Sequence, residues 1–153
     1  MKKILIFCGL LLSVFFFITE IKTRAQTRRA VSGAEVTGTF REKASGSEFS
    51  ILALGQGKLK IAFSGVYPYK TANGEATANM GQAMGEAQIA GDEATFTPED
   101  TEECTITLKF LTRGRLKVTQ IGTDAECGFG HNVSADGSYN KVSSKKPKFD
   151  LSN

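Results

Sequence analysis

The 153-residue sequence is poor in residues that commonly carry catalysis: it has one histidine and three cysteines, alongside three prolines and no tryptophan. It also has no GxSxG elbow, no HExxH pair and no glycine-rich phosphate loop, which excludes the standard motifs of α/β-hydrolases, zinc proteases and nucleotide-binding enzymes. The single histidine, His131, lies in a glycine-containing stretch that predicts a turn. We therefore predict that the chain is not an enzyme and that it holds no cofactor and no metal.

Long apolar runs are also missing, with one exception of 15 residues, Ile4 to Ile18, which follows two lysines. A membrane-spanning helix needs about 20 apolar residues. A short positive start, a shorter apolar run and small residues before the cleavage point, here Thr23 and Ala25, are instead typical of a secretory signal peptide. We therefore assign residues 1–25 to a signal peptide and predict a secreted or periplasmic protein. Contact with a membrane is expected only through this segment, if it stays uncleaved as an anchor.

The positive charge of the chain belongs largely to this leader. The whole sequence has 19 Lys+Arg and 16 Asp+Glu, a net charge of +3. Removal of residues 1–25 takes away four basic residues and one acidic residue, which leaves 15 of each. A neutral chain lacks the basic surface that nucleic-acid binding needs, so we exclude nucleic acid as a partner. Acidic residues between 92 and 103 and lysines between 141 and 148 remain as local patches, which we interpret as solvated surface. The alternatives are a weak calcium site or a docking patch for a basic partner at the acidic residues, and contact with anionic envelope polymers or lipid head groups at the lysines.

Two cysteines remain after the leader, Cys104 and Cys127. An even number of cysteines in an exported chain favours a disulfide. Their spacing of 23 residues matches neither a CxxC redox pair nor a zinc-binding cluster. We therefore predict a structural disulfide, which by closing a loop of this size contributes about 3 kcal/mol.

Apolar and polar residues alternate along most of the remaining chain, as in half-buried β-strands. The expected strands are 36–41, 48–54, 58–64, 66–69, 85–90, 94–97, 104–111, 115–121 and 138–142. Short turns at 55–57 and 112–114 predict two hairpins. About eight short strands without helical periodicity predict an all-β fold, a small antiparallel barrel or sandwich. We place this single β domain at residues 35–149, between a flexible leader at 26–34 and a tail at 150–153.

Residues 72–85 interrupt this alternation. Their alanines and methionines favour helix, but three glycines would each cost about 1 kcal/mol in a helix interior. We predict a long loop that leads into a strand. Long loops on rigid β scaffolds commonly bind partners, so Asn79, Met80 and Met84 are candidate recognition residues. The alternative is a connector without a binding role.

The most distinctive stretch of the sequence is CGFGHNVSADGSY, from Cys127 to Tyr139. It resembles the CGFG-x-NV-x-A-x-G-x-Y signature of a small exported bacterial β domain. Further similar residues are Gly85, Ala87, Ala94, Phe96, Cys104, Phe110, Leu116, Val118, Gln120, Pro147, Lys148 and Phe149. The resemblance covers residues 38–149 and implies an uncharacterised domain that is sometimes found beside an LprI-type lysozyme-inhibitor region, which this chain lacks. It implies no catalytic residue.

The residues of this signature are those of a scaffold. Its glycines permit turns with positive φ, and we expect Phe129 and Tyr139 to plug one end of the barrel. The alternative interpretation makes the loop from Phe129 to Asn132 a recognition edge, with His131 exposed on it.

Together these features predict a monomeric, exported binding module for an envelope protein or glycan. Its most specific form is an inhibitor of a lysozyme-like hydrolase, which needs a protruding loop able to enter a cleft. Residues 43–48, with Ser45 and Ser47, and residues 72–85 are the candidates. One alternative is a carrier of a small ligand, which needs an apolar cavity inside the barrel. The other is a small hydrolase, which needs His131 or a pair of acids facing a pocket.

Overall fold

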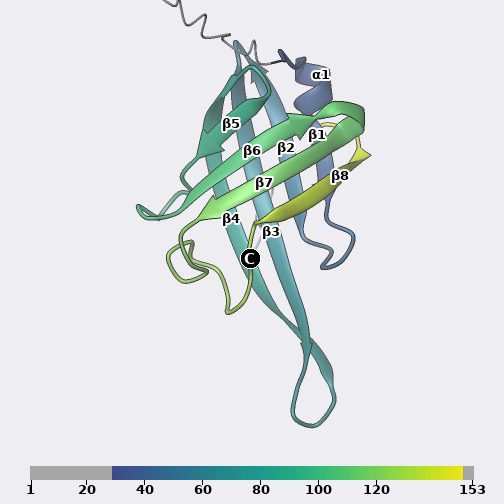
Figure 1. The fold of residues 1–153 in the computed structure, drawn as a ribbon, viewed down its shortest axis with the longest axis vertical. Helices are drawn as coiled ribbons and strands as arrows, with labels where there is room; N and C mark the ends of the chain where they lie inside the picture. The colour runs from purple at the N-terminus through teal and green to yellow at the C-terminus, as the bar shows by residue number, and fades with distance from the viewer. Residues whose placement is uncertain (1–28, 150–153) are drawn as a thin grey trace, which may run out of the picture.

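Eight strands, each hydrogen-bonded to the next along the chain, close into an antiparallel barrel in the computed structural model (Figure 1). The strands are β1 (Gly38–Arg41), β2 (Glu48–Gly55), β3 (Lys58–Lys70), β4 (Ala76–Ala90), β5 (Glu93–Phe96), β6 (Thr105–Leu111), β7 (Arg115–Ile121) and β8 (Gly137–Ser143). A short helix, α1 (Gly33–Val36), precedes β1, and a 3-10 turn, η1 (Thr112–Gly114), joins β6 to β7. The structure describes residues 29–149; the signal peptide assigned to 1–25 and the tail at 150–153 lie outside them.

The predicted all-β class is confirmed, and of the two predicted architectures the barrel is the one observed. Antiparallel pairing of β8 with β1 closes it. The two hairpins predicted from their short turns are β2–β3 and β6–β7. Within the described residues, no helix is long and apolar enough to cross a membrane.

Two predicted boundaries were wrong. Residues 66–69, expected to be a separate strand, are the continuation of β3, which runs unbroken to Lys70. The long loop expected at 72–85 is only a turn, because β4 begins at Ala76 and pairs with β3 from Lys70↔Ala76 back to Lys58↔Gln88. The glycines that weakened the helical pattern serve packing here: a Cβ on Gly85 would lie 2.6 Å from the Phe96 ring.

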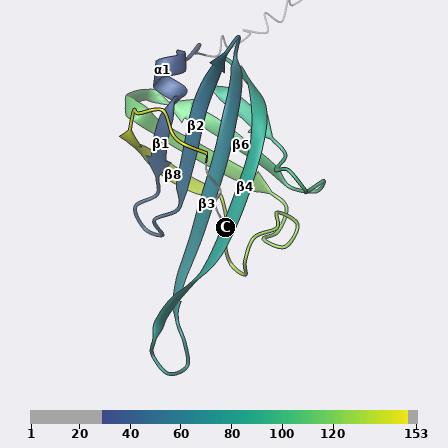
Figure 2. The same ribbon diagram turned by 180° about the vertical axis from the view of Figure 1, so that it is seen from behind.

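The β3–β4 hairpin is longer than the barrel that it belongs to. β2 follows β3 only as far as Ser64, and β5 pairs with β4 only at Ile89 and Ala90. The far part of the hairpin therefore projects beyond the other strands, at the end of the barrel opposite α1 (Figures 1 and 2). We call residues 66–80 the arm.

Side chains fill the interior of the barrel. Alternate residues of each strand point inward, and on β3 these are Leu59, Ile61 and Phe63, each no more than 1% exposed. At the arm end the rings pack in a chain, with centroid distances of 4.7 Å for Phe49–Phe63, 5.0 Å for Phe49–Tyr139 and 5.3 Å for Phe63–Phe129. The two aromatic residues of the signature, Phe129 and Tyr139, are thus both part of the core. The buried Tyr139 hydroxyl donates to the carbonyl oxygen of Ala135 at 2.9 Å.

The predicted disulfide between Cys104 and Cys127 is confirmed. Cys104 directly precedes β6, and Cys127 lies in the connection from β7 to β8, so the bond ties this connection to the barrel wall. Both cysteines are buried.

Replacing both cysteines with alanine is expected to lower the free energy of unfolding by about 3 kcal/mol, because the bond restricts the unfolded chain. Urea unfolding of the oxidised protein and of the Cys104→Ala/Cys127→Ala variant measures the difference. Ile121→Ala, at a residue that is 66% exposed, is the control and should change stability by less than about 0.5 kcal/mol. Equal unfolding midpoints for the double variant and the wild type would contradict the prediction.

Helix α1 begins with a capping box at the end of the segment assigned to the leader. The Ser32 hydroxyl accepts from the backbone N–H of Glu35, and the Glu35 carboxylate accepts from the backbone N–H of Ser32 at 2.9 Å. Arg29 also pairs with Glu35, at 2.6 Å. These interactions anchor residues 29–36 against the barrel, where Val36 is buried.

The same contacts lower the pKa of the Glu35 carboxyl to about 2, the Ser32 backbone hydrogen bond being the largest cause and the Arg29 side chain the next. Because the pKa is lower in the folded chain, the stabilisation is present above the ordinary value of 4.5 and is lost as the pH falls through about 2. We expect an NMR carboxyl titration of Glu35 with a midpoint near pH 2. Ser32→Ala should raise this midpoint and Ser138→Ala should not; a wild-type midpoint near 4.5 would contradict the prediction.

Candidate functional site

Two of the three segments chosen from the sequence as recognition loops, 72–85 and 129–132, lie against each other. The backbone N–H of Gly130 donates to the carbonyl oxygen of Met80 at 2.9 Å. The side-chain amide of Asn79 donates to the carbonyl oxygen of His131 at 2.6 Å. The connection between β7 and β8 therefore lies against the base of the arm and supports it (Figure 2).

This connection owes its shape to Asp124. The Asp124 carboxylate accepts from the backbone N–H of Asn132 at 2.6 Å and from that of Ala125 at 2.8 Å, while its carbonyl oxygen accepts from Phe129 N–H at 2.7 Å. The first two hydrogen bonds, with that from Asn132 the larger cause, hold the pKa of the Asp124 carboxyl below its usual range. One carboxylate thus folds residues 124–132 into a compact turn.

Asp124 was not identified from the sequence, although a signal was present. The residues TDAE, from Thr123 to Glu126, match the capping-box pattern. In the structure the Glu126 carboxylate accepts from Thr123 N–H at 2.6 Å, and the Thr123 hydroxyl accepts from Glu126 N–H at 3.2 Å. The same pattern, SGAE, marks α1 at Ser32.

Glycines let the connection approach the arm closely. A Cβ on Gly81 would lie 2.9 Å from the Phe129 ring, and one on Gly65 would collide with Val133 and lie 2.7 Å from Phe63. Phe129 is itself only 7% exposed. Phe129 therefore anchors the site from inside, and its role as a recognition residue stays a prediction for a side chain that is buried in this structure.

Ser45 and Ser47 support the arm from its other side. The Ser47 hydroxyl accepts from the backbone N–H of Val66 at 3.0 Å and is oriented by Ser45, whose hydroxyl accepts from Ser47 N–H at 3.0 Å. Ser47 is 2% exposed, so its observed role is to support the backbone, and its role in recognition stays a prediction. The buried hydroxyl replaces a missing strand partner where β3 leaves the barrel.

The exposed face of the arm carries two tyrosines that were not singled out from the sequence. Tyr67 and Tyr69 are 40% and 42% exposed, and they pair across the hairpin with Asn79 and Thr77. These four residues continue the inward-facing side of β3 and β4 past the end of the barrel, next to the backbone of His131. We call Tyr67, Tyr69, Thr77, Asn79 and His131 the tyrosine face.

The two methionines lie elsewhere. Met80 is 54% exposed but alternates to the opposite side of the arm, where it pairs with Val66. Met84 lies within the barrel wall, half-buried, and its carbonyl oxygen accepts from Glu99 N–H at 2.8 Å. Neither belongs to the tyrosine face.

His131 and Asp124 form the arrangement closest to catalytic chemistry. His131 Nδ1 lies 3.5 Å from Asp124 Oδ2, but the imidazole is 82% exposed. Among residues 29–149 no hydroxyl or thiol is hydrogen-bonded to the ring, and no group of three or more His, Cys, Asp or Glu in the same range could hold a metal ion.

No family model, curated protein or solved structure matches this chain. Its function is therefore inferred from its own geometry.

Gly81→Ala is expected to displace the Phe129 ring and to lower the free energy of unfolding by about 1–3 kcal/mol, because the packed ring has no room to give. Amide hydrogen exchange should show faster exchange at Gly130, whose N–H bonds to the arm. Gln82→Ala, at the exposed neighbouring position, is the control. Unchanged protection of Gly130 in Gly81→Ala would show that the connection does not depend on this contact.

Proposed function

We propose that this chain is an exported, monomeric binding module of the cell envelope, and that it inhibits a lysozyme-like hydrolase by inserting the arm into the substrate cleft. The observation that carries the proposal is the arm itself, a two-stranded projection with Tyr67 and Tyr69 on one face. The disulfide between Cys104 and Cys127 fits export, because such bonds persist in oxidising compartments.

The size of the arm suits a cleft. At a rise of about 3.3 Å per residue, residues 66–70 carry β3 roughly 16 Å beyond the barrel. A two-stranded ribbon is also narrow. Two hydrogen bonds between Thr71 and Glu75 close its tip. The Thr71 N–H donates to the Glu75 carbonyl oxygen at 2.9 Å, and the Glu75 N–H donates to the Thr71 hydroxyl at 3.2 Å.

The composition of the arm indicates how it would bind. Tyrosines provide a large contact area with little rotational freedom to lose, and they are enriched among residues that dominate binding energy. Lys70 and Glu75 are the charged residues of the arm, one of each sign. Binding through this surface should therefore depend on packing and hydrogen bonds and only weakly on salt concentration.

The base of the arm is fixed before any partner arrives. Ser47 holds it on one side, and the Asp124-organised connection holds it on the other. A surface that is already ordered loses less conformational entropy on binding, which favours affinity.

The two alternative functions have less support. A carrier needs space inside the barrel, whereas the aromatic chain from Phe49 to Phe129 fills the arm end of the interior. A hydrolase needs His131 in a pocket, whereas its ring is 82% exposed.

The test uses protein expressed as the complete chain and purified, assayed at micromolar concentration against c-type, g-type and i-type lysozymes. We expect inhibition of at least one of them, and a loss of about tenfold or more in Tyr67→Ala/Tyr69→Ala, since removing two central aromatic contacts costs this much. Leu54→Ala and Ile121→Ala, at exposed apolar residues outside the arm, are the controls and should inhibit like the wild type.

Two results would count against the proposal. If all the lysozymes keep full activity, the hydrolase is not the partner. If inhibition survives in the double tyrosine variant but falls in a control variant, the binding surface lies outside the arm.

A further inference from the structure

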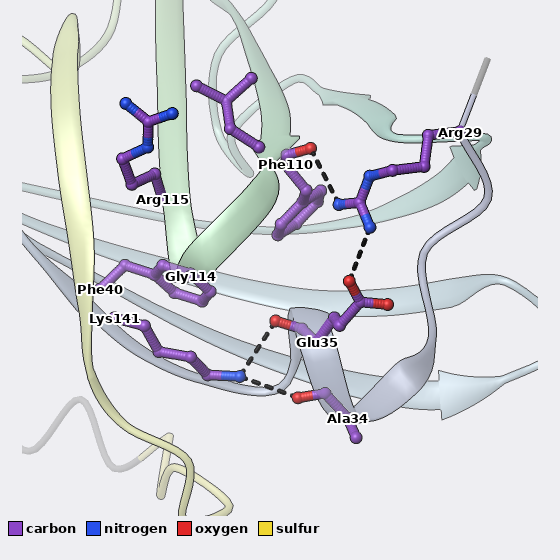
Figure 3. A pocket seen from close by; sticks show the side chains of 9 residues that line it. Arg29, Ala34, Glu35, Phe40, Phe110, Gly114, Arg115 and Lys141 are labelled. Atoms are coloured by element: carbon purple, nitrogen blue, oxygen red, sulfur yellow. Dashed lines mark hydrogen bonds and ion pairs between the residues drawn. The ribbon is translucent and has the colours of Figure 1, made fainter.

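A pocket of about 270 Å³ lies at the end of the barrel opposite the arm. Helix α1 forms one wall, and the ends of β1, β6, β7 and β8 form the others (Figure 3). Beneath it lie the largely buried rings of Phe40 and Phe110, which meet edge to face with centroids 6.1 Å apart, and the Lys141 ammonium lies 5.5 Å from the centroid of the Phe40 ring. The proposed function of the arm makes no use of this pocket.

Three cationic side chains and one carboxylate line the pocket. Arg29 is already engaged, with Glu35 at 2.6 Å and with the carbonyl oxygen of Phe110 at 3.4 Å. Lys141 is engaged as well, because its ammonium donates to the last carbonyls of α1, those of Ala34 at 2.8 Å and Glu35 at 3.0 Å. The pocket therefore keeps an excess of positive charge, although most of its donors are in use.

Arg115 is the exception. Its guanidinium has no hydrogen bond or ion pair with any of residues 29–149. Figure 3 shows Arg115 and Arg29 on opposite sides of the Phe110 ring. Arg115 therefore lies at the rim of a positively charged pocket with all of its guanidinium N–H donors free for a ligand.

The size and chemistry of the pocket restrict the ligand. Pockets for drug-sized molecules commonly measure about 300–1,000 Å³, so this one suits a smaller molecule. A planar guanidinium matches a carboxylate in a two-pronged geometry. A single free guanidinium neutralises one carboxylate, whereas a doubly charged phosphate would keep one negative charge without a free cationic partner, because Arg29 and Lys141 are already engaged.

We propose that this pocket binds a small organic carboxylate, which pairs with the Arg115 guanidinium and packs its apolar body against the apolar part of the pocket lining. Glu35 competes with such a ligand for Arg29, because its carboxylate occupies that guanidinium. Gly114 keeps the rim open: a Cβ at this position would lie 3.0 Å from the Lys141 Cβ.

The test is an NMR titration of isotope-labelled protein, expressed as the complete chain, with benzoate as the probe. We expect saturable shifts of the amide signals of Glu35, Arg115 and Lys141, with the arm signals unchanged. Arg115→Gln should weaken binding by about fivefold or more, because the carboxylate loses its charged partner. Lys117→Gln is the matched control, since it removes the same charge from the next outward position of β7, and should bind like the wild type.

A second variant tests the competition independently. Gln at position 35 still satisfies the capping box, so Glu35→Gln keeps α1 while releasing Arg29, and benzoate affinity should rise. Benzyl alcohol, the neutral analogue, should give no saturable shifts, and phenyl phosphate should bind more weakly than benzoate. The proposal is overturned if Arg115→Gln and Lys117→Gln behave alike, if Glu35→Gln lowers the affinity, or if benzyl alcohol or phenyl phosphate binds as tightly as benzoate.

Discussion

The ladder between β3 and β4 is the interaction on which the rest of the molecule depends. It joins the two strands without a break from Lys58↔Gln88 to Lys70↔Ala76. Over its first half the ladder is part of the barrel wall, and over its second half it stands without neighbouring strands. An isolated hairpin is marginally stable in water, so the outer half relies on its continuity with the inner half. Ser47 and Gly130 satisfy the backbone at the point where the wall ends.

Strands with one buried face could be predicted from the sequence, and the arm could not. β6 alternates cleanly because Ile106, Leu108 and Phe110 face the core, and that alternation is visible in the residues themselves. From Ala76 to Met80 no residue of β4 is buried, so nothing requires apolar and polar residues to alternate there. Glycines in this region suggest a loop, but Gly81 and Gly85 lie in β4, where the rings of Phe129 and Phe96 leave no room for a Cβ atom. Such contacts between distant segments leave no local pattern.

In the candidate site, too, features with a local sequence pattern could be predicted, and contacts between distant segments could not. Asn79 and His131 were each chosen from the sequence on local grounds, yet the hydrogen bond between them joins segments 52 residues apart. Tyr67 and Tyr69 were overlooked because a tyrosine in an alternating strand predicts a core position, and only the length of the hairpin places them outside the barrel. The burial of Ser47 was equally hidden: a serine in a Gly-containing loop suggests exposure, whereas its hydroxyl is buried and accepts from the backbone N–H of Val66. Asp124 and Glu35 could have been found from their capping boxes.

The disulfide lies outside the strand ladders that close the barrel. Cys127 lies outside every strand, in the connection that supports the arm, and Cys104 precedes β6. The hydrogen-bonded ladders that close the barrel involve neither cysteine. Breaking the bond therefore removes no hydrogen bond of these ladders, and it removes the covalent tether of the segment that carries His131. The disulfide thus constrains the connection beside the arm, whereas closure of the barrel depends on strand pairing alone.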